Sequence, residues 1–81
     1  MEFLIQGSRG EAVVILKKIL NEIGHSLEIN DFFCESTTQA VADFQRAASL
    51  TPDGTVGDIT WAFLINVQEM KARSRAEAIN Q

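Results

Sequence analysis

The stretch Asn30-Asp31-Phe32-Phe33-Cys34-Glu35-Ser36-Thr37 is repeated at Asp53-Gly54-Thr55-Val56-Gly57-Asp58-Ile59-Thr60, and this repeat decides the fold. Each copy opens on an Asn or Asp, has an apolar residue three places on and a Thr seven places on, and reaches an apolar pair that begins ten places on. The polar opening is typical of a turn, and the spaced apolar residues are typical of a helix. A repeated turn-plus-helix unit predicts a small helical domain whose units bury their apolar faces together.

The composition agrees with one small globular domain. The chain has 81 residues, of which 46% are hydrophobic, so we expect a single modest core. The net charge of −4 argues against nucleic acid as a partner, because binding to nucleic acid depends on clustered Lys and Arg. No apolar run approaches the ~20 residues of a membrane span. The first residues lack the basic region and long apolar core of a signal peptide.

Residues 9–23 have the pattern of an amphipathic helix. Ser8 and Glu11 have the spacing of a capping box, in which two side chains satisfy free backbone donors at a helix start. Gly24 stands where a helix often ends in a left-handed residue. The expected apolar stripe consists of Ala12, Val13, Leu16, Ile19, Leu20 and Ile23, and the expected polar side consists of Lys17, Lys18, Asn21 and Glu22.

Two further helices follow the repeated turns. A capping box over Ser36–Gln39 predicts the second, with a start one or two residues earlier left open. Pro52 and Gly54 predict a turn, because Pro fixes one φ and Gly supplies a positive φ. Asp58 favours the start of the third helix. The expected apolar stripes are Thr37, Ala40, Val41, Phe44, Ala47 and Ala48 in the second helix, and Ile59, Phe63, Leu64 and Val67 in the third.

The expected fold class is therefore all-α, a small three-helix bundle with an internal turn-helix repeat and both turns on one side. Residues 68–81 are rich in helix formers but poor in apolar residues, so an extension of the third helix and a linker both stay open. We divide the chain into a domain at residues 1–66 and a C-terminal helical extension or linker at residues 67–81.

Over residues 4–66 the sequence also carries the motifs of a known family. They are Gly7-Ser8-Arg9-Gly10-Glu11-Ala12-Val13, Leu16, Leu20-Asn21, Gly24, Phe33, Thr37, Ala40-Val41, Phe44-Gln45, Leu50, Asp53-Gly54, Val56-Gly57, Thr60-Trp61 and Leu64. This combination resembles the type 1 family of peptidoglycan-binding domains, three-helix modules found beside bacterial and phage cell-wall hydrolases. The resemblance implies a cell-wall-binding module of the same fold.

The first turn departs from that family. The family usually has Asp-Gly-x-Phe-Gly there, whereas this chain has Asn30-Asp31-Phe32-Phe33-Cys34. Asp31 tolerates left-handed backbone better than most residues, but Cys34 fits poorly if its position needs a positive φ. Lys17 stands where the family often has Gln. These departures do not affect the fold that the resemblance implies. They make binding through the first turn a weaker expectation.

The repeated turns are the candidate ligand site. Peptidoglycan offers stem carboxylates, amides and sugars, and turns that lead into helix N-termini present free N–H groups that can meet a carboxylate. We expect the turns to line one shallow groove. Its candidate residues are Asn30, Asp31, Phe32, Asp53, Gly54, Thr55, Gly57, Thr60 and Trp61. For each residue we favour a role within its own turn over ligand contact, and for Trp61 we favour packing over sugar stacking.

Other side chains have plainer interpretations. Phe33 and Phe44 should be buried, Phe32 should be exposed, and Gln45 should lie at the surface or bond to a neighbouring loop. His25 and Cys34 lack a third group to orient them as a catalytic pair, and one Cys with one His does not make a closed metal site. We expect no enzyme activity, no metal and no cofactor.

The predicted function is non-catalytic binding of bacterial cell-wall peptidoglycan, at the peptide stem and adjoining sugar, which targets an associated hydrolase to its substrate. The predicted location is the cell envelope, either periplasm or cell wall, and the expected oligomeric state is a monomer. The alternative is a protein–protein interaction module that keeps the fold and has lost wall binding. The altered first turn and the basic, helix-prone tail favour that alternative.

Overall fold

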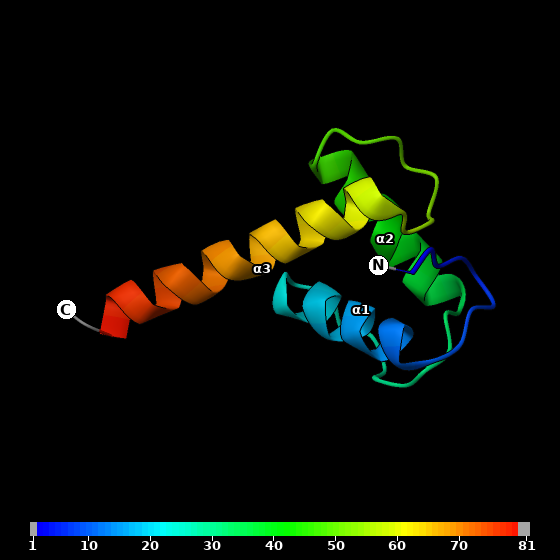
Figure 1. The fold of residues 1–81 in the computed structure, drawn as a ribbon, viewed down its shortest axis with the longest axis horizontal. Helices are drawn as coiled ribbons and strands as arrows, with labels where there is room; N and C mark the ends of the chain where they lie inside the picture. The colour runs from blue at the N-terminus through cyan, green and yellow to red at the C-terminus, as the bar shows by residue number, and fades with distance from the viewer. Residues whose placement is uncertain (1, 80–81) are drawn as a thin grey trace.

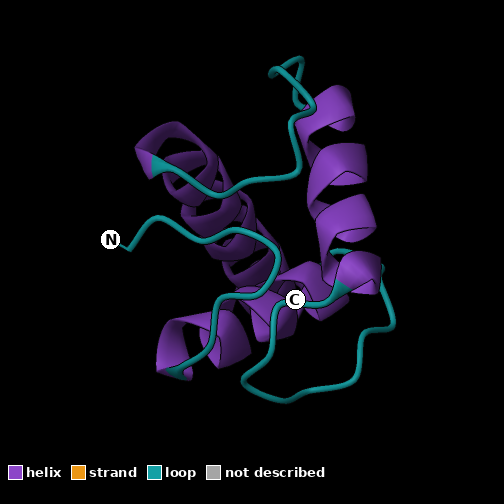
Figure 2. Ribbon diagram, turned by 90° about the vertical axis from the view of Figure 1, so that its right-hand side faces the viewer, coloured by secondary structure: helices purple, strands orange, loops and turns teal. Residues whose placement is uncertain are grey.

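The computed structural model describes residues 2–79, with side chains described through Lys71. It contains three helices, α1 (Glu11–Glu22), α2 (Glu35–Ala47) and α3 (Asp58–Ile79). In Figure 1, α1 lies alongside the first half of α3 and α2 crosses at the end where α3 begins. Figure 2 shows the helices joined by loops, and over the described residues the only β pairings are two isolated bridges. The prediction of an all-α three-helix domain is therefore confirmed.

Helix α1 buries the predicted face. Val13, Leu16, Ile19 and Leu20 are buried, with Ala12 and Ile23 packed beside them. Gly24 has a φ of 117°, as expected of a residue that ends a helix. The predicted capping box is wrong, because Gly10 is the N-cap and no side chain caps it. The Ser8 hydroxyl instead accepts a hydrogen bond from the amide of Ile5, three residues upstream, at 3.0 Å.

Helix α2 begins at Glu35 with Cys34 as its N-cap, so the earlier start is the correct one and the capping box at Ser36 and Gln39 does not form. Most of the predicted stripe is buried, but Ala47 is exposed. The buried members are Thr37, Ala40, Val41 and Phe44, joined by Gln45. A polar residue at the edge of the stripe therefore enters the interior.

Helix α3 begins at Asp58 as predicted, but the predicted buried face is partly wrong. Ile59 is 66% exposed and Phe63 is 41% exposed, whereas Trp61 is only 1% exposed. The face that packs inward runs through Trp61 and Leu64, which keeps helical spacing. Burial of Trp61 removes more apolar surface from water than burial of Ile59 would, because the indole is the larger group. Both faces include Leu64, so periodicity alone did not separate them.

The C-terminal segment continues α3 without a break to Ile79, which confirms the helical interpretation over residues 68–79. Residues 80–81 lie outside the described residues. The second half of α3 extends past the other two helices (Figure 1). Within it, Lys71 Nζ donates to the carbonyl of Glu22 at the end of α1, at 2.9 Å. No described helix is long and apolar enough to cross a membrane.

Residues 2–10, here called the N-terminal strap, connect the two repeated turns. Leu4 and Val56 exchange two backbone hydrogen bonds of 3.0 and 2.8 Å. Phe33 donates to Ser8 and accepts from Gly7, at 2.9 and 2.8 Å. Val56 and Phe33 are equivalent positions in the repeat, and both are fully buried. The strap therefore holds both turns through the same repeat position.

Candidate functional site

The side chain of Gln45 lies beneath the second turn and holds it in shape through hydrogen bonds. This side chain is 2% exposed and its amide nitrogen donates to Asp53 Oδ1 at 3.0 Å, to the Thr55 carbonyl at 2.8 Å and to Thr60 Oγ1 at 3.1 Å. Its carbonyl oxygen accepts the buried amide of Gly54 at 2.9 Å. The prediction that Gln45 bonds to a neighbouring loop is confirmed, and the surface alternative is wrong. A buried amide so fully bonded fixes the shape of the turn.

Gly54 is required at its position for two reasons. Its φ of 76° lies in the left-handed region, which disfavours residues with a Cβ. A Cβ there would also lie 2.7 Å from Thr38 Cγ2. The predicted positive φ is confirmed. The turn is thus pressed against α2, which contributes both Gln45 and Thr38.

Asp53 closes the same turn from the solvent side. Its carboxylate accepts from the Thr55 amide at 2.9 Å and from the Thr55 hydroxyl at 3.0 Å. The Thr55 amide, followed by the Gln45 side chain, lowers the pKa of Asp53 from its usual value, because these donors stabilise the charged form. Asp53 is exposed, so the turn presents a fixed negative charge to solvent.

Two surface hollows adjoin the second turn. One has a volume of about 410 Å³ and is lined by Phe3, Asp53, Thr55, Gly57, Asp58, Ile59 and Thr60. The other, of about 280 Å³, is lined by Gln45, Leu50, Thr51, Asp53, Ile59 and Thr60. Both have Asp53 and Thr60 as polar groups and the exposed Ile59 as an apolar one. The structure thus brings five sequence-predicted residues to one surface: Asp53, Thr55, Gly57 and Thr60 line it, and Gly54 supports it.

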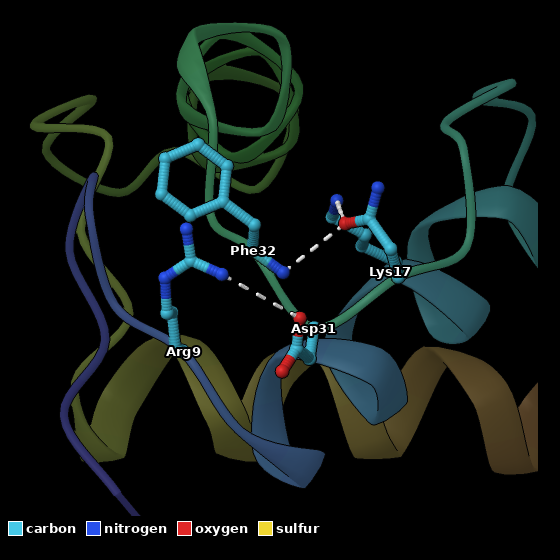
Figure 3. A network of polar contacts seen from close by, with 5 residues as sticks. Arg9, Lys17, Asp31 and Phe32 are labelled. Atoms are coloured by element: carbon cyan, nitrogen blue, oxygen red, sulfur yellow. Dashed lines mark hydrogen bonds and ion pairs between the residues drawn. The ribbon is translucent and has the colours of Figure 1, made fainter.

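The first turn is held in a different way. Asn30 Oδ1 accepts from the amide of Phe32 at 3.1 Å and from Lys17 Nζ. On the outer side, the Arg9 guanidinium lies 4.6 Å from the centroid of the Phe32 ring and 4.0 Å from an Asp31 oxygen. Figure 3 shows Arg9 on one side of the turn and Lys17 on the other. Phe32 is exposed as predicted, whereas Phe33 is buried as predicted.

Lys17 is a site residue that the sequence analysis missed. It was placed on the polar face of the first helix, yet it is 1% exposed. Leu16-Lys17 follows Ala12-Val13 with the same spacing by which Phe44-Gln45 follows Ala40-Val41. Each of these two polar residues bonds the Asn or Asp that opens the next turn. Extending the repeat backwards into the first helix would have revealed this equivalence.

The two turns also differ in backbone. Over the described residues, Ser49 is the only non-Gly residue with a positive φ, so Asp31 does not take the left-handed conformation of its counterpart Gly54. The doubt about Cys34 is removed, because its φ is −96°. The Thr37 hydroxyl, followed by the nearby backbone amides of Thr37 and Ser36, lowers the pKa of the Cys34 thiol to about 7.

The first turn lines a hollow of its own, here called the Lys17 hollow. It has a volume of about 150 Å³ and is lined by Lys17, Ser26, Leu27, Glu28, Asn30, Cys34, Ser36 and Thr37. It shares no residue with the two hollows of the second turn. The expectation that both turns line one groove is therefore corrected to separate hollows, because each turn faces the side chain beneath it.

Trp61 packs inside the protein, as favoured from the sequence. Its indole N–H donates to the carbonyl of Glu2 in the N-terminal strap, so its polar atom is satisfied. It lines none of the three hollows described above. His25 lines an apolar hollow between the helices, apart from Cys34, and the described residues contain no cluster of three His, Cys, Asp or Glu that could hold a metal.

Known proteins share this architecture. An uncharacterized protein from the bpoA1 3' region of Kitasatospora aureofaciens is 36% identical over 63 residues, which are 75% of this chain and 53% of that protein. The chain thus spans about half the length of this curated relative. The Burkholderia AP3 phage endolysin matches 78% of this chain with 24% of its own, at 35% identity and a TM-score of 0.76. The SleB N-terminal domain matches 82% of this chain with 92% of its own, at 27% identity and a TM-score of 0.79.

The match at the level of the family falls on the part of the chain that carries the repeat. The family model described as a putative peptidoglycan-binding domain covers residues 9–64, which include α1, α2, both turns and the buried start of α3. On this match, the chain belongs to the family of putative peptidoglycan-binding domains.

Proposed function

We propose that this chain binds peptidoglycan without catalysis, contacting the peptide stem and the adjoining sugar, and that it targets an associated hydrolase to the cell wall. Family membership over residues 9–64 is the observation that carries the proposal. The endolysin among its structural relatives supports the targeting role. One weak module gains its value by keeping a tethered enzyme at high local concentration over an insoluble substrate.

We place the main contact at the second turn. Its polar groups are fixed by Gln45 before any ligand arrives, so binding would lose little conformational entropy there. Ile59 and Phe3 are exposed apolar residues beside it, which suits the apolar face of a sugar or a stem methyl group. Asp31 and Phe32 of the first turn form a separate contact region. Thr60 lines this surface and also accepts a hydrogen bond from Gln45, and Trp61 contributes indirectly by bonding the N-terminal strap.

We also propose where the module acts and which residues belong to it. The module acts in the cell envelope, as a monomer, and residues 1–66 suffice for wall binding. Residues 67–81 act as a helical connection and not as part of the wall-binding surface.

A pelleting assay with purified insoluble peptidoglycan tests the proposal. We expect the wild type to sediment with the wall, and Asp53→Ala and Phe32→Ala to sediment less. Asp43→Ala is the matched control, because Asp43 is an exposed carboxylate on α2 that pairs with Arg46 at 3.1 Å and lines none of the hollows at the two turns. A wild type that stays in the supernatant at high protein and wall concentrations refutes wall binding. Pelleting that neither turn variant weakens refutes the proposed surface.

The second candidate is a protein–protein interaction module that has lost wall binding. Helix α3 favours it, because it continues 15 residues past residue 64, where the family match ends. An interaction module would stay in the supernatant in the same assay, so one experiment separates the two candidates.

A further inference from the structure

The Lys17 hollow contains a buried ammonium group that forms no ion pair with a described side chain, although Glu28 lines the same hollow. Lys17 is 1% exposed, and buried charges are normally paired with an opposite charge. Among the described side chains, ion pairs join Arg9 to Asp31 and Arg46 to Asp43, and none involves Lys17. Its ammonium group has three N–H donors, and the described residues accept one of them, through Asn30.

The neutral groups around Lys17 are hydrogen-bond donors suited to an anion. Ser36 and Thr37 contribute hydroxyl groups to the wall of the hollow, and they lie in the first turn of α2. The N-terminus of a helix carries partial positive charge and unbonded amides. The hollow thus combines a full positive charge, hydroxyls and a helix start, and no one of these alone would define a site.

The repeat shows that this charge is a special feature of the first half of the chain. At the equivalent position, Gln45 fully bonds the second turn without any net charge. The fold therefore holds such a turn with a neutral amide, and a buried cation is not needed for that purpose. The charge of Lys17 is therefore available for a role beyond its bond to Asn30.

We propose that the Lys17 hollow binds a terminal carboxylate, with the Lys17 ammonium and the exposed Ser36 hydroxyl as its donors. Glu28 lines the same wall, so a singly charged carboxylate meets less repulsion there than a dianion would. The volume of about 150 Å³ is about five times the ~30 Å³ that one water occupies in the liquid. This size suits the last residue of a peptide better than a disaccharide.

This inference rests on the proposed function for its biological ligand, the carboxylate that ends a peptidoglycan stem. It assigns to the two turns different parts of the same polymer. The second turn takes the neutral parts of the polymer, and the first takes the charged chain end.

The test is a titration of the ¹⁵N-labelled protein by NMR at pH 6, where the Cys34 thiol is mostly protonated because its pKa is about 7. The probe is N-acetyl-D-alanine, and the matched neutral probe is N-acetyl-D-alaninamide. We expect saturable shifts of the Asn30, Ser36 and Thr37 amides with the acid alone. Equal shifts with the neutral amide, or no shifts at these residues, overturn the proposal.

Two variants distinguish the effect of the buried Lys17 charge on binding from the effect of the protein's net charge. Lys17→Gln copies the residue of the second half and should weaken binding of the acid about tenfold or more, since it removes a charge-assisted contact. Lys18→Gln removes the same charge from the exposed neighbouring residue and should leave binding unchanged. Unaltered amide positions around Gly54 in Lys17→Gln show that the fold is intact. Unchanged binding by Lys17→Gln overturns the proposal.

The pelleting assay keeps this inference distinct from the proposed function. A protein that sediments with the wall but ignores N-acetyl-D-alanine refutes the carboxylate site and leaves wall binding in place. A protein that binds N-acetyl-D-alanine through Lys17 but does not sediment supports the carboxylate site and refutes wall binding.

Discussion

Replacing Lys17 and Gln45 with the same residue should change stability by very different amounts. The two side chains occupy equivalent places beneath the two turns, and both are almost fully buried. Methionine is the chosen replacement, because it is unbranched and of similar length, so it fills the space without a hydrogen-bonding group. Lys17→Met and Gln45→Met therefore isolate what each polar group contributes.

The structure gives the size of each effect. Gln45→Met leaves the buried Gly54 amide without a partner, which costs about 1–3 kcal/mol. It also removes the donor to the Thr55 carbonyl and Thr60 hydroxyl, at a net of about 1 kcal/mol each. We expect a total loss of about 2–4 kcal/mol, because the methionine recovers some apolar burial. For a domain of this size that lowers the Tm by roughly 10–25 °C.

Lys17→Met removes one hydrogen bond and one buried charge. Asn30 Oδ1 keeps its bond from the Phe32 amide, so no buried acceptor is left unsatisfied. Replacing a buried charge with an apolar side chain is often neutral or stabilising. We expect the free energy of unfolding to stay within about 1 kcal/mol of the wild type or to rise by up to about 2 kcal/mol.

Urea and thermal unfolding measure both variants, with Trp61 fluorescence and far-ultraviolet circular dichroism as two probes of one transition. The fluorescence probe is internal because Trp61 is buried. A loss of stability in Lys17→Met as large as that in Gln45→Met would refute the reasoning, since it would make the ammonium group part of the bonding that holds the fold. A gain in stability together with loss of N-acetyl-D-alanine binding would mark Lys17 as a functional residue.

Four further predictions concern the glycines, Cys34 and the C-terminal part of α3. Gly54→Ala should destabilise the protein by about 2 kcal/mol or more, because strain at positive φ adds to the contact with Thr38. Gly24 also has a positive φ, of 117°, but the space around its Cβ position is open. Gly24→Ala should therefore lower the free energy of unfolding by only about 1 kcal/mol. Equal losses for the two variants in urea unfolding would contradict the packing argument. Cys34 should react with iodoacetamide at a rate that reaches half its maximum near pH 7, because its pKa is lowered to about 7, and a midpoint near 9 would refute the contribution of the Thr37 hydroxyl. The lowered pKa means that the folded state favours the Cys34 thiolate. The stability contributed by the thiolate is therefore fully present above the pKa of the unfolded state and is lost as the pH falls through about 7. Cys34→Ala should remove this pH dependence. A chain that ends at residue 70 lacks the hydrogen bond from Lys71 to Glu22. It should still sediment with the wall and should lose less than about 1 kcal/mol of stability. Loss of sedimentation would show that the binding module extends into residues 71–81.

The sequence predicted the fold well because the repeat combines signals of several kinds. The turn residues, the helical spacing and the helix starts all agreed at Asp53–Asp58, and Gly54 and Asp58 behave as predicted. The face of α3 was harder to predict, because two overlapping stripes share Leu64. The stripe with the larger side chain is the buried one, because Trp61 buries more apolar surface than Ile59 would. A periodicity pattern contains no information about side-chain size.

The site was harder to predict than the fold. A Lys on a helix is usually exposed, so the general rule placed Lys17 outside, and only its equivalence with Gln45 indicates otherwise. The shared groove was also inferred wrongly. Equivalent sequence positions give equivalent local structure, but each turn rests on the helix that precedes it, so the two turns open onto separate hollows.

The N-terminal strap has a consequence for how this chain forms during synthesis. Leu4 leaves the ribosome before its hydrogen-bonding partner Val56, which follows 52 residues later. Closing so long a loop carries an entropic cost that must be met before the pair contributes any stability. The Gly7 and Ser8 bonds to Phe33 close a shorter loop and can form first. The nascent chain should therefore gain full protection against proteases only after the second turn has emerged from the exit tunnel.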